Sequence, residues 1–340
     1  MGTMTEFDFA RRIARLQRKI AEWRAGGVLL CATDGFDANV HYYSGDSTHP
    51  AAIFATRSNT LFASLHPKDF EGLFDECIPL QQLRKRLKEE LRNPGKLAVD
   101  DKSPYAGAAV RTALKARKRI VPLGEKLEEL RLVKDAGEQR EIMNAAMITR
   151  KAIAAAENEG FAGKSGHEIA GVMEAAARNE GASLDAFPPM VLSGSSTAFF
   201  HETTSGRKVA PGEPVLIDCG CRSNFYCGDV TRTFANGCRG KEFNDALEAV
   251  SQAKRAAERK AKPGASVKEI TRIAEQVIAE HGFKQHSFAK EGLALGHHVG
   301  LNVHDAPLKG TLRKGFAITI EPGVYKRGEF GARLEDTLVV

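Results

Sequence analysis

The order of apolar and polar positions in the first part of the chain predicts alternating helices and strands. Apolar residues spaced three or four apart mark one face of a helix that stops at Gly26-Gly27: Phe9, Ile13, Leu16, Ile20 and Trp23. The run VLLCAT at 28–33 predicts a buried strand, AAIFAT and TLFAS predict a hairpin, and KLAVD at 96–100 predicts a further strand. Helices are expected at FEGLFDE and LQQLRKRLKEELR. We therefore expect a small α/β domain over residues 1–122.

The second part, residues 123–340, contains an internal duplication. GKSGHEIAGVMEAAARNEG at 163–181 aligns with GASVKEITRIAEQVIAEHG at 264–282, at an offset of 101. Ser165 and Ser266 each precede a glutamate by three residues, which predicts a capping box in both halves, and both helices end in glycine. GEPVLIDCG at 212–220 aligns with GFAITIEPG at 315–323, at an offset of 103, and DVT aligns with EDT. Two similar halves related by a pseudo-twofold axis are expected.

Each half carries acidic residues inside its predicted strands. A turn at Ser223-Asn224 would place Asp218 directly opposite Asp229, where two like charges are unfavourable without a cation. The duplication equates Asp218 with Glu321 and Asp229 with Glu335. Four carboxylates that converge on the pseudo-twofold axis require about two divalent cations.

Histidines add nitrogen ligands to this oxygen-rich set. His297 lies in GHHVGLNVHDAP, a glycine-flanked segment whose backbone can approach a site closely. His201 and His304 share the offset of 103 that relates Asp218 to Glu321. One imidazole among several carboxylates suits Mn, Co or Zn, and two such metals can together bridge a hydroxide and polarise a carbonyl.

Simpler readings compete with the metal site. A single acidic residue in a strand usually marks an edge or loop, and a lone histidine is more often structural. A zinc site built from cysteines lacks the usual Cys-x-x-Cys pairs; its candidates would be Cys219, Cys221, Cys227 and Cys238. The acidic residues that recur in both halves are the stronger signal.

Composition narrows the function further. The 340 residues carry a net charge of +6, but the basic tracts at 115–119 and 253–262 are typical of solvated helix faces without interleaved aromatic residues. We expect no nucleic-acid partner. We also expect no membrane insertion, since no apolar run approaches the roughly 20 residues of a membrane span. The N-terminus lacks the apolar core of a secretory signal and the six cysteines are expected to be reduced, which favours a cytoplasmic location.

Four motifs resemble those of the pita-bread metallopeptidases, the family that includes methionine aminopeptidase, aminopeptidase P and prolidase. They are LIDCGCRSNFYCGDVTRTF, GHHVGLNVHDAP, ITIEPGVY and ARLEDTLVV, and they match in order and spacing. The resemblance covers nearly the whole chain. It implies an α+β fold in which a pita-bread catalytic domain with duplicated halves, residues 123–340, follows a smaller creatinase-type α/β domain, residues 1–122.

The resemblance also implies roles for individual residues. Asp229 and Glu335 would bridge two divalent metal ions, manganese first with cobalt or zinc as alternatives. Asp218 would hold one metal, while His297 and Glu321 hold the other. The catalytic residues implied are His201, His304, Glu321 and Arg333. Of these, His201 and His304 would contact the substrate, and Glu321 would relay a proton to the leaving amine. The segment RLED, in which Arg333 stands two residues before Glu335, resembles the corresponding segment of the proline-specific branch.

The implied activity is that of a metal-dependent exopeptidase on Xaa-Pro bonds in dipeptides or longer peptides. We place Xaa-Pro dipeptidase (prolidase) ahead of aminopeptidase P, and a catalytically silent binding protein on the same fold last. Leu293, His298 and Asp305 depart from the usual family residues, at positions that line or flank the substrate pocket. Family members usually continue a little beyond the position of Val340, so whether a short C-terminal segment follows is an open question.

We also expect a homodimer, as in many members of this family. The segment HYYSGDSTHP at 41–50 is expected to be a loop, from which His41, Tyr43 or His49 approaches a substrate pocket.

Overall fold

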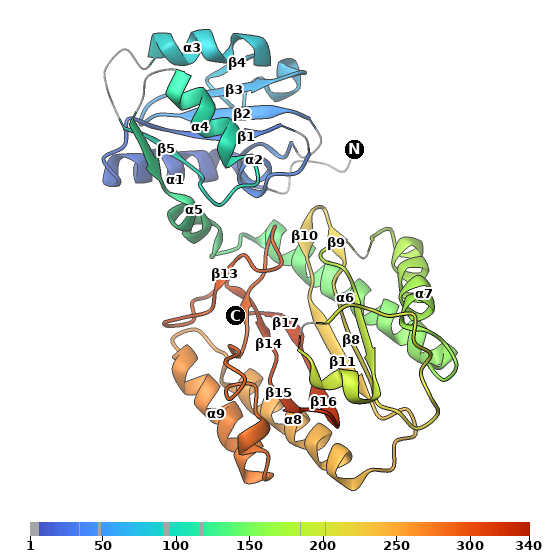
Figure 1. The fold of residues 1–340 in the computed structure, drawn as a ribbon. Coiled ribbons are helices and arrows are strands. Elements are labelled where there is room, and N and C mark those ends of the chain that lie inside the picture. The colour runs from blue at the N-terminus through green and yellow to red at the C-terminus, as the bar shows by residue number, and fades with distance from the viewer. Residues whose placement is uncertain are drawn as a thin grey trace. The chain divides into compact units, whose positions relative to one another are not determined.

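The computed structural model forms two compact units, Met1–Arg131 and Leu132–Val340 (Figure 1). It describes residues 7–33, 35–46, 49–90, 96–115, 119–183, 185–200 and 202–340. Among these residues, no helix combines the length and the apolar content that crossing a membrane would require.

The described part of the first unit is built on a mixed six-stranded sheet with the order β4-β3-β2-β1-β5-β6. β2 is antiparallel to β1 and β3, and the other pairs are parallel. The strands are β1 (Gly27–Ala32), β2 (Ala51–Ala55), β3 (Thr60–Ser64), β4 (Glu76–Pro79), β5 (Lys96–Val99) and β6 (Arg119–Pro122). The predicted hairpin and the strands at 28–33 and 96–100 are confirmed.

Helices α1 to α5 belong to the same unit. They are α1 (Phe9–Glu22), α2 (Ala38–Ser44), α3 (Leu83–Glu90), α4 (Ala106–Lys115) and α5 (Gly124–Arg131), with short 3-10 turns η2 (Pro67–Phe70) and η3 (Leu80–Gln82). Our domain boundary was residue 122, whereas α5 falls within the first unit. The reason is that Leu127 and Leu130 are buried there, and the Leu130 carbonyl accepts hydrogen bonds from Arg15 and Tyr42.

Two local predictions in this unit were wrong. FEGLFDE is not a helix, because it begins at the end of η2 and its last residue starts β4. The expected loop at 41–50 begins instead within α2. The Asp37 carboxylate accepts the N–H groups of Asn39 and Val40 at the start of this helix, and Gly45 ends it in a left-handed conformation. His41 and Tyr43 are consequently 8% and 1% exposed, respectively.

The second unit repeats one arrangement twice, as the duplication predicts. The first half contains α6 (Ala136–Glu159), α7 (Gly166–Asn179), β7 (Met190–Ser193), η4 (Gly194–Ala198), β8 (Val215–Cys219) and β11 (Val230–Phe234). The second half contains α8 (Lys241–Lys260), α9 (Val267–Glu280), η5 (Lys284–His286), β12 (His297–His298), β14 (Ala317–Ile320) and β17 (Asp336–Val339). The strand order β7-β8-β11 in one half matches β12-β14-β17 in the other.

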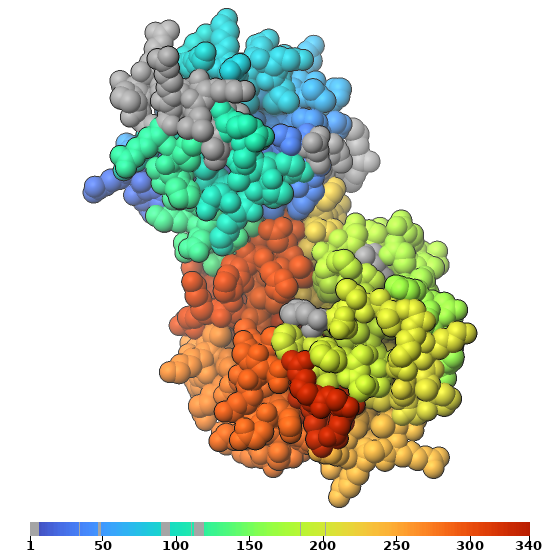
Figure 2. All heavy atoms as spheres, in the orientation of Figure 1, coloured from blue at the N-terminus to red at the C-terminus, as the bar shows by residue number. Residues whose placement is uncertain are grey.

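Short hairpins complete each half. They are β9 (Arg222–Ser223) with β10 (Tyr226–Cys227), β13 (Ala306–Pro307) beside β12, and β15 (Gly323–Lys326) with β16 (Phe330–Arg333). In Figure 2 the first half is yellow-green and much of the second half is orange, and dark-red residues near the C-terminal end of the second half meet the yellow-green region. β11 and β17 join the halves, since the Glu335 N–H donates to the Thr231 carbonyl at 3.0 Å.

Apolar packing decides which face of each sheet is free for chemistry. In β8, Val215, Ile217 and Cys219 belong to the core that α6 and α7 cover. In β14, Ile318 and Ile320 belong to the corresponding core under α8 and α9. Side chains alternate along a strand. Asp218 in the first half and Glu321, just after β14 in the second, therefore each lie on the face of their strand that points away from the helix-covered core.

The helix ends test the predicted capping signals. Ser165 forms the expected capping box with Glu168, whereas the Ser266 side chain caps nothing, so that prediction was wrong for the second half. Gly181 and Gly282 both adopt positive φ just after the helix, and the N–H groups of the residues that follow reach back to Ala177 and Ile278. These are matching Schellman endings, as expected.

Candidate metal centre

The hairpin that carries Asp218 and Asp229 has a different register from the one predicted. Asp218 lies opposite Thr231, and Tyr226 pairs with Ser223, so the turn is Asn224-Phe225. Both turn residues have positive φ, 42° and 69°, as a type I′ turn requires. Asp229 lies two residues before Thr231 and therefore stays on the face of Asp218, but diagonal to it. The expected direct opposition was wrong; the shared face was right.

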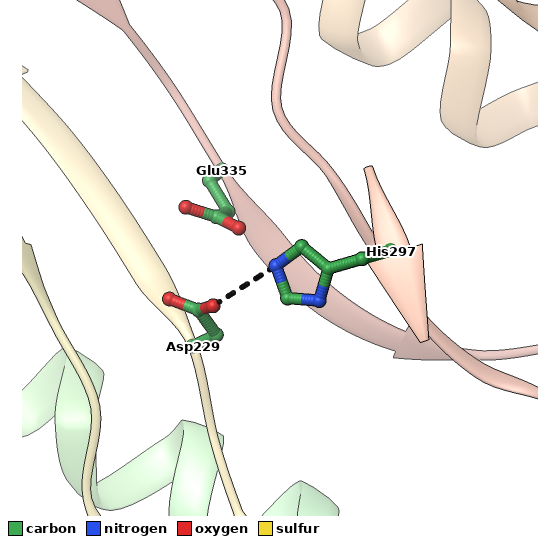
Figure 3. A group of neighbouring side chains, drawn as sticks. All are labelled: Asp229, His297 and Glu335. Carbon is green, nitrogen blue, oxygen red and sulfur yellow. Dashed lines mark ion pairs between the residues drawn. The ribbon is translucent and has the colours of Figure 1, made fainter. Parts of the chain in front are cut away.

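Three ligating side chains nevertheless converge from both halves (Figure 3). One ligand atom from each of Asp229, His297 and Glu335 lies within 4.8 Å of the others. The His297 Nε2 atom is 3.3 Å from Asp229 Oδ2 and 3.6 Å from Glu321 Oε1. Ligand atoms of Asp229, Glu321 and Glu335 thus lie around the His297 imidazole, which brings together four of the five predicted metal ligands.

Glycines allow two of these residues to reach the centre. A Cβ on Gly228, just before Asp229, would lie 2.4 Å from the Ala146 nitrogen in α6. A Cβ on Gly296, just before His297, would lie 2.1 Å from the Thr319 carbonyl oxygen. No larger residue fits at either position without a backbone shift, as the glycine-flanked sequence suggests.

Asp218, the fifth predicted ligand, is engaged by Arg333. Its Oδ2 accepts a hydrogen bond of 2.6 Å from the Arg333 Nη2. The same buried guanidinium donates through Nη1 to the Tyr325 hydroxyl at 3.0 Å and through Nε to Thr231 Oγ1 at 3.2 Å. Arg333 therefore supplies the positive charge nearest to Asp218 and fixes the orientation of that carboxylate.

Burial and mutual repulsion make this group of carboxylates expensive to ionise. Burial and the charges of Asp218 and Glu321 raise the pKa of Asp229 well above its ordinary value. Burial, then Asp229, Glu321 and Asp218, do the same to the pKa of Glu335. Burial also raises the pKa of Glu321, against the lowering effect of His297 and Arg333. A cation bound among them would oppose all three shifts.

The free oxygens of the cluster fit a divalent cation. Asp218 Oδ1, Asp229 Oδ1 and Glu335 Oε1 are buried and have no hydrogen-bond partner among the described residues. A buried carboxylate oxygen without a partner is costly, and a hard divalent cation removes that cost. On the imidazole, Nδ1 donates to the His298 carbonyl oxygen at 3.2 Å, and in the neutral ring this bond leaves the Nε2 lone pair free to bind a cation.

Threonines at matching positions of the two halves each form a hydrogen bond to an acidic residue of the other half. Neither threonine was predicted from the sequence. Thr231 Oγ1 donates to Glu335 Oε2 at 2.6 Å. Thr337 Oγ1 accepts from the Asp229 N–H at 3.0 Å and donates to the Asp229 carbonyl at 2.9 Å. Each threonine stands two residues after its own acid, on the same strand face. That repeated spacing in DVT and EDT was the available signal.

The remaining predicted residues have mixed outcomes. His201 lies outside the described residues. The exposed His304 ring has its centroid 4.0 Å from that of His297. Leu293 is partly buried against the core of the second half. His298 and Asp305 are 2% and 1% exposed inside the unit, and their place lining or flanking the pocket stays a prediction.

The cysteine alternative finds no support in the described part of the chain. Cys219, Cys221 and Cys227 are buried free thiols, and Cys238 is half-buried. Burial raises the pKa of Cys221 to about 11 and that of Cys227 to about 12, which disfavours the thiolates that zinc needs. The only group of three or more potential ligands found among the described residues is the carboxylate–histidine cluster.

Comparison with known proteins gives consistent results. Residues 140–340 match the model of metallopeptidase family M24. The Xaa-Pro dipeptidase of Pyrococcus horikoshii is 30% identical over 332 residues, which cover 95% of this chain and 93% of that protein.

Solved structures extend the similarity to both units. The prolidase from Pyrococcus horikoshii OT3 superposes with a TM-score of 0.85 at 27% identity, covering 97% of this chain and 95% of that one. The X-Pro aminopeptidase from Thermotoga maritima MSB8 gives a TM-score of 0.81 at 26% identity, covering 96% and 94%. The expected fold is confirmed: an N-terminal α/β domain precedes a pita-bread catalytic domain. The chain belongs to metallopeptidase family M24, in the branch of prolidase and aminopeptidase P.

Proposed function

We propose that this chain hydrolyses the peptide bond before proline in short peptides, with Xaa-Pro dipeptides as its first substrates. The observation that carries the proposal is the buried group of partnerless carboxylate oxygens around His297, in a chain whose relatives over nearly its full length include an Xaa-Pro dipeptidase. A silent binding protein would have no reason to keep so costly a cluster of acids.

The cluster would hold two divalent cations, manganese first and cobalt or zinc as alternatives. Asp229 and Glu335 come from different halves and would hold both ions. Asp218 would complete the ligands of one ion, and His297 with Glu321 would complete the other. When bound, two such cations activate a water molecule and polarise the scissile carbonyl.

Glu321 is the proposed proton carrier. The Thr319 hydroxyl donates to Glu321 Oε1 at 3.2 Å, which fixes the carboxylate beside the proposed metal ions, where it can take and give a proton. Glu321 would accept a proton from the attacking water, whose oxygen bonds to the Xaa carbonyl carbon. As the bond to the proline nitrogen breaks, the same proton passes to that nitrogen.

Two further residues would act on the substrate or the ligands. His304, exposed beside the His297 ring, would contact the scissile peptide. Arg333 would keep the Asp218 Oδ2 engaged, so that Asp218 presents its partnerless Oδ1. We propose the same substrate contact for His201 from the family resemblance alone.

Aminopeptidase P is the second candidate, because the chain is also similar to the X-Pro aminopeptidase from Thermotoga maritima. A panel of Xaa-Pro dipeptides and Xaa-Pro-Yaa tripeptides, assayed on chelator-treated protein reloaded with Mn²⁺, Co²⁺ or Zn²⁺, separates the two. We expect cleavage of dipeptides. Cleavage confined to tripeptides and longer peptides would favour the aminopeptidase, and no cleavage with any metal would favour the silent protein.

We also propose a homodimer, on the family resemblance, and size measurement in solution tests it. Of the three residues expected to approach a substrate pocket, only His49 keeps a substantially exposed side chain, at 48%. Its replacement is therefore the informative one: a changed preference for peptide length in His49→Ala would support the idea, and an unchanged preference would contradict it.

A further inference from the structure

A single carbonyl oxygen organises the segment that carries His297 and His304. The His298 oxygen accepts Nδ1–H of His297 at 3.2 Å and the N–H of Asp305 at 2.8 Å. A carbonyl can only accept, so the first of these bonds requires the proton of a neutral His297 to sit on Nδ1. The tautomer that leaves Nε2 facing Asp229 and Glu321 thus depends on where the His298 carbonyl is held.

The Asp305 side chain extends this arrangement to Lys134. Asp305 Oδ2 lies 2.8 Å from Lys134 Nζ, and both side chains have 0% exposure. A fully buried ion pair contributes little net stability after desolvation, so geometry is a better reason for its presence than energy. A Cβ on Gly300 would lie 2.4 Å from Asp305 Oδ2 and 2.8 Å from Lys134 Nζ, so the backbone of the segment closes tightly around the pair.

Lys134 is itself fixed to the strand that leads to Glu321. Its N–H donates to the Gly315 carbonyl at 2.7 Å, and Gln139 Nε2 donates to its carbonyl at 2.8 Å. The adjacent Val133 forms a β-bridge with Phe316, immediately before β14. The Lys134 ammonium therefore has a fixed place relative to both β14 and the segment after His297.

We propose that Lys134 is a positioning residue for the candidate metal centre. Through its ion pair with Asp305 it holds the His298 carbonyl in place, and that carbonyl keeps the His297 proton on Nδ1 and Nε2 free to bind a metal ion. The role of Nε2 as a ligand rests on the proposed function; the control of the tautomer does not. Partners of this kind behind a metal ligand typically change metal affinity by about 10- to 100-fold when they are lost.

The test begins with the metal-free protein. Nitrogen-15 NMR of histidine-labelled protein at alkaline pH distinguishes Nδ1-protonated from Nε2-protonated imidazole, and a His297→Gln variant assigns the signal. We expect Nδ1–H in the wild type. In the double variant Lys134→Met with Asp305→Asn, which removes both charges and leaves no buried charge unpaired, we expect a mixture of tautomers. Lys151→Met, which breaks the exposed pair with Glu180, is the matched control and should match the wild type.

Metal affinity gives the second readout. We expect Mn²⁺ binding, measured by calorimetry on folded protein of checked thermal stability, to weaken about 10- to 100-fold in the double variant and to stay unchanged in Lys151→Met. A double variant with the wild-type tautomer and wild-type Mn²⁺ affinity would overturn the proposal, as would Nε2–H in the wild type. If the tautomer follows Lys134 but no Xaa-Pro peptide is cleaved, the positioning role stands and the proposed function fails.

Discussion

The two halves of the catalytic unit share a scaffold and differ in charge. Both place a pair of helices over three strands in the same order, and both set an acid two residues before a threonine. Of the proposed metal ligands, the first half contributes the carboxylates Asp218 and Asp229. The second half adds His297 and Arg333 to its own Glu321 and Glu335, so the imidazole and the guanidinium that contact these acids both come from the second half.

One aligned position shows the difference most clearly. The alignment of DVT with EDT places Cys227 where the second half has Arg333. Burial raises the pKa of Cys227 to about 12, so it stays neutral, whereas Arg333 reaches Asp218 in the other half. A symmetric scaffold has thus become one site with two unlike sides.

The largest loss of activity is expected when one of the proposed bridging acids, Asp229 of the first half or Glu335 of the second, is replaced. Glu335→Gln should lower kcat/KM by more than the roughly 100-fold typical of residues that only support a ligand, because this carboxylate is proposed to serve both ions. His297→Ala should lower metal content less than Glu335→Gln does. Metal content by elemental analysis checks this, with the exposed Glu329→Gln as control; equal metal content in the two variants would contradict the bridging role.

Removing Arg333 should destabilise the protein, because the Asp218 carboxylate loses its positively charged partner. Arg333→Met leaves the partly buried Asp218 without its ion-pair partner and beside three other carboxylates; breaking a fully buried pair typically costs about 3–5 kcal/mol, which is an upper bound for this one. Denaturant unfolding should show the full loss in chelator and a smaller loss in saturating Mn²⁺, since a bound cation compensates Asp218. The same loss under both conditions would mean that no cation binds next to Asp218.

The pH dependence of the metal-free protein should carry the opposite sign from that of a usual salt-bridged acid. The pKa values of Asp229, Glu335 and Glu321 are raised in the folded state. Their contribution to stability is therefore fully present below the ordinary pKa of about 4 and is lost as pH rises through the folded values. Unfolding free energy in chelator should fall with rising pH.

A matched comparison isolates this contribution. The fall in unfolding free energy should be shallower in a variant that combines Asp229→Asn with Glu335→Gln, because two of the three responsible acids are gone. Parallel pH profiles for the wild type and this variant would contradict the assignment.

The two threonines should differ in their effects: loss of Thr231 should weaken metal binding, whereas loss of Thr337 should lower stability. Thr231→Val removes a hydroxyl that donates to the Glu335 carboxylate and should weaken metal binding by about tenfold. Thr337→Val removes contacts to the Asp229 backbone and should cost about 1 kcal/mol of stability with less effect on metal affinity. Calorimetry and thermal unfolding distinguish the two; the reverse ranking would show that the threonines are equivalent supports.

The smallest effect concerns the helix starts. Ser165→Ala should cost about 1 kcal/mol, because a capping box is lost. Ser266→Ala should cost distinctly less, since that side chain makes no capping hydrogen bond. Thermal unfolding of the two variants checks this, and equal costs would mean that the second cap forms in solution.

The sequence revealed the acids of the centre because the duplication repeats them, so each acid supports the other. It did not reveal the hairpin register, because Asn224-Phe225 adopts positive φ at a phenylalanine, which no common turn signal marks. The apolar spacing of FEGLFDE fitted a helix as well as a strand. Contacts such as Thr231 with Glu335 link residues 104 positions apart, which no local pattern can report.

Lys134 illustrates the same limit. It precedes the capping box of Asp135 and Glu138, and the sequence gives no sign that its side chain is buried beside Asp305, 171 positions away. Burial of a lysine is uncommon and depends on a partner that only the fold brings near. The acids and His297 of the cluster could be predicted from the sequence, and so could Arg333 from its motif, whereas the buried Lys134 and the two threonines could not.

Anomalous diffraction from crystals soaked in Mn²⁺ tests the central claim most directly. The account predicts two manganese sites in the second unit, both contacted by Asp229 and Glu335, with Asp218 on one ion and His297 with Glu321 on the other. A single site, or manganese that avoids the carboxylates of either half, would contradict it.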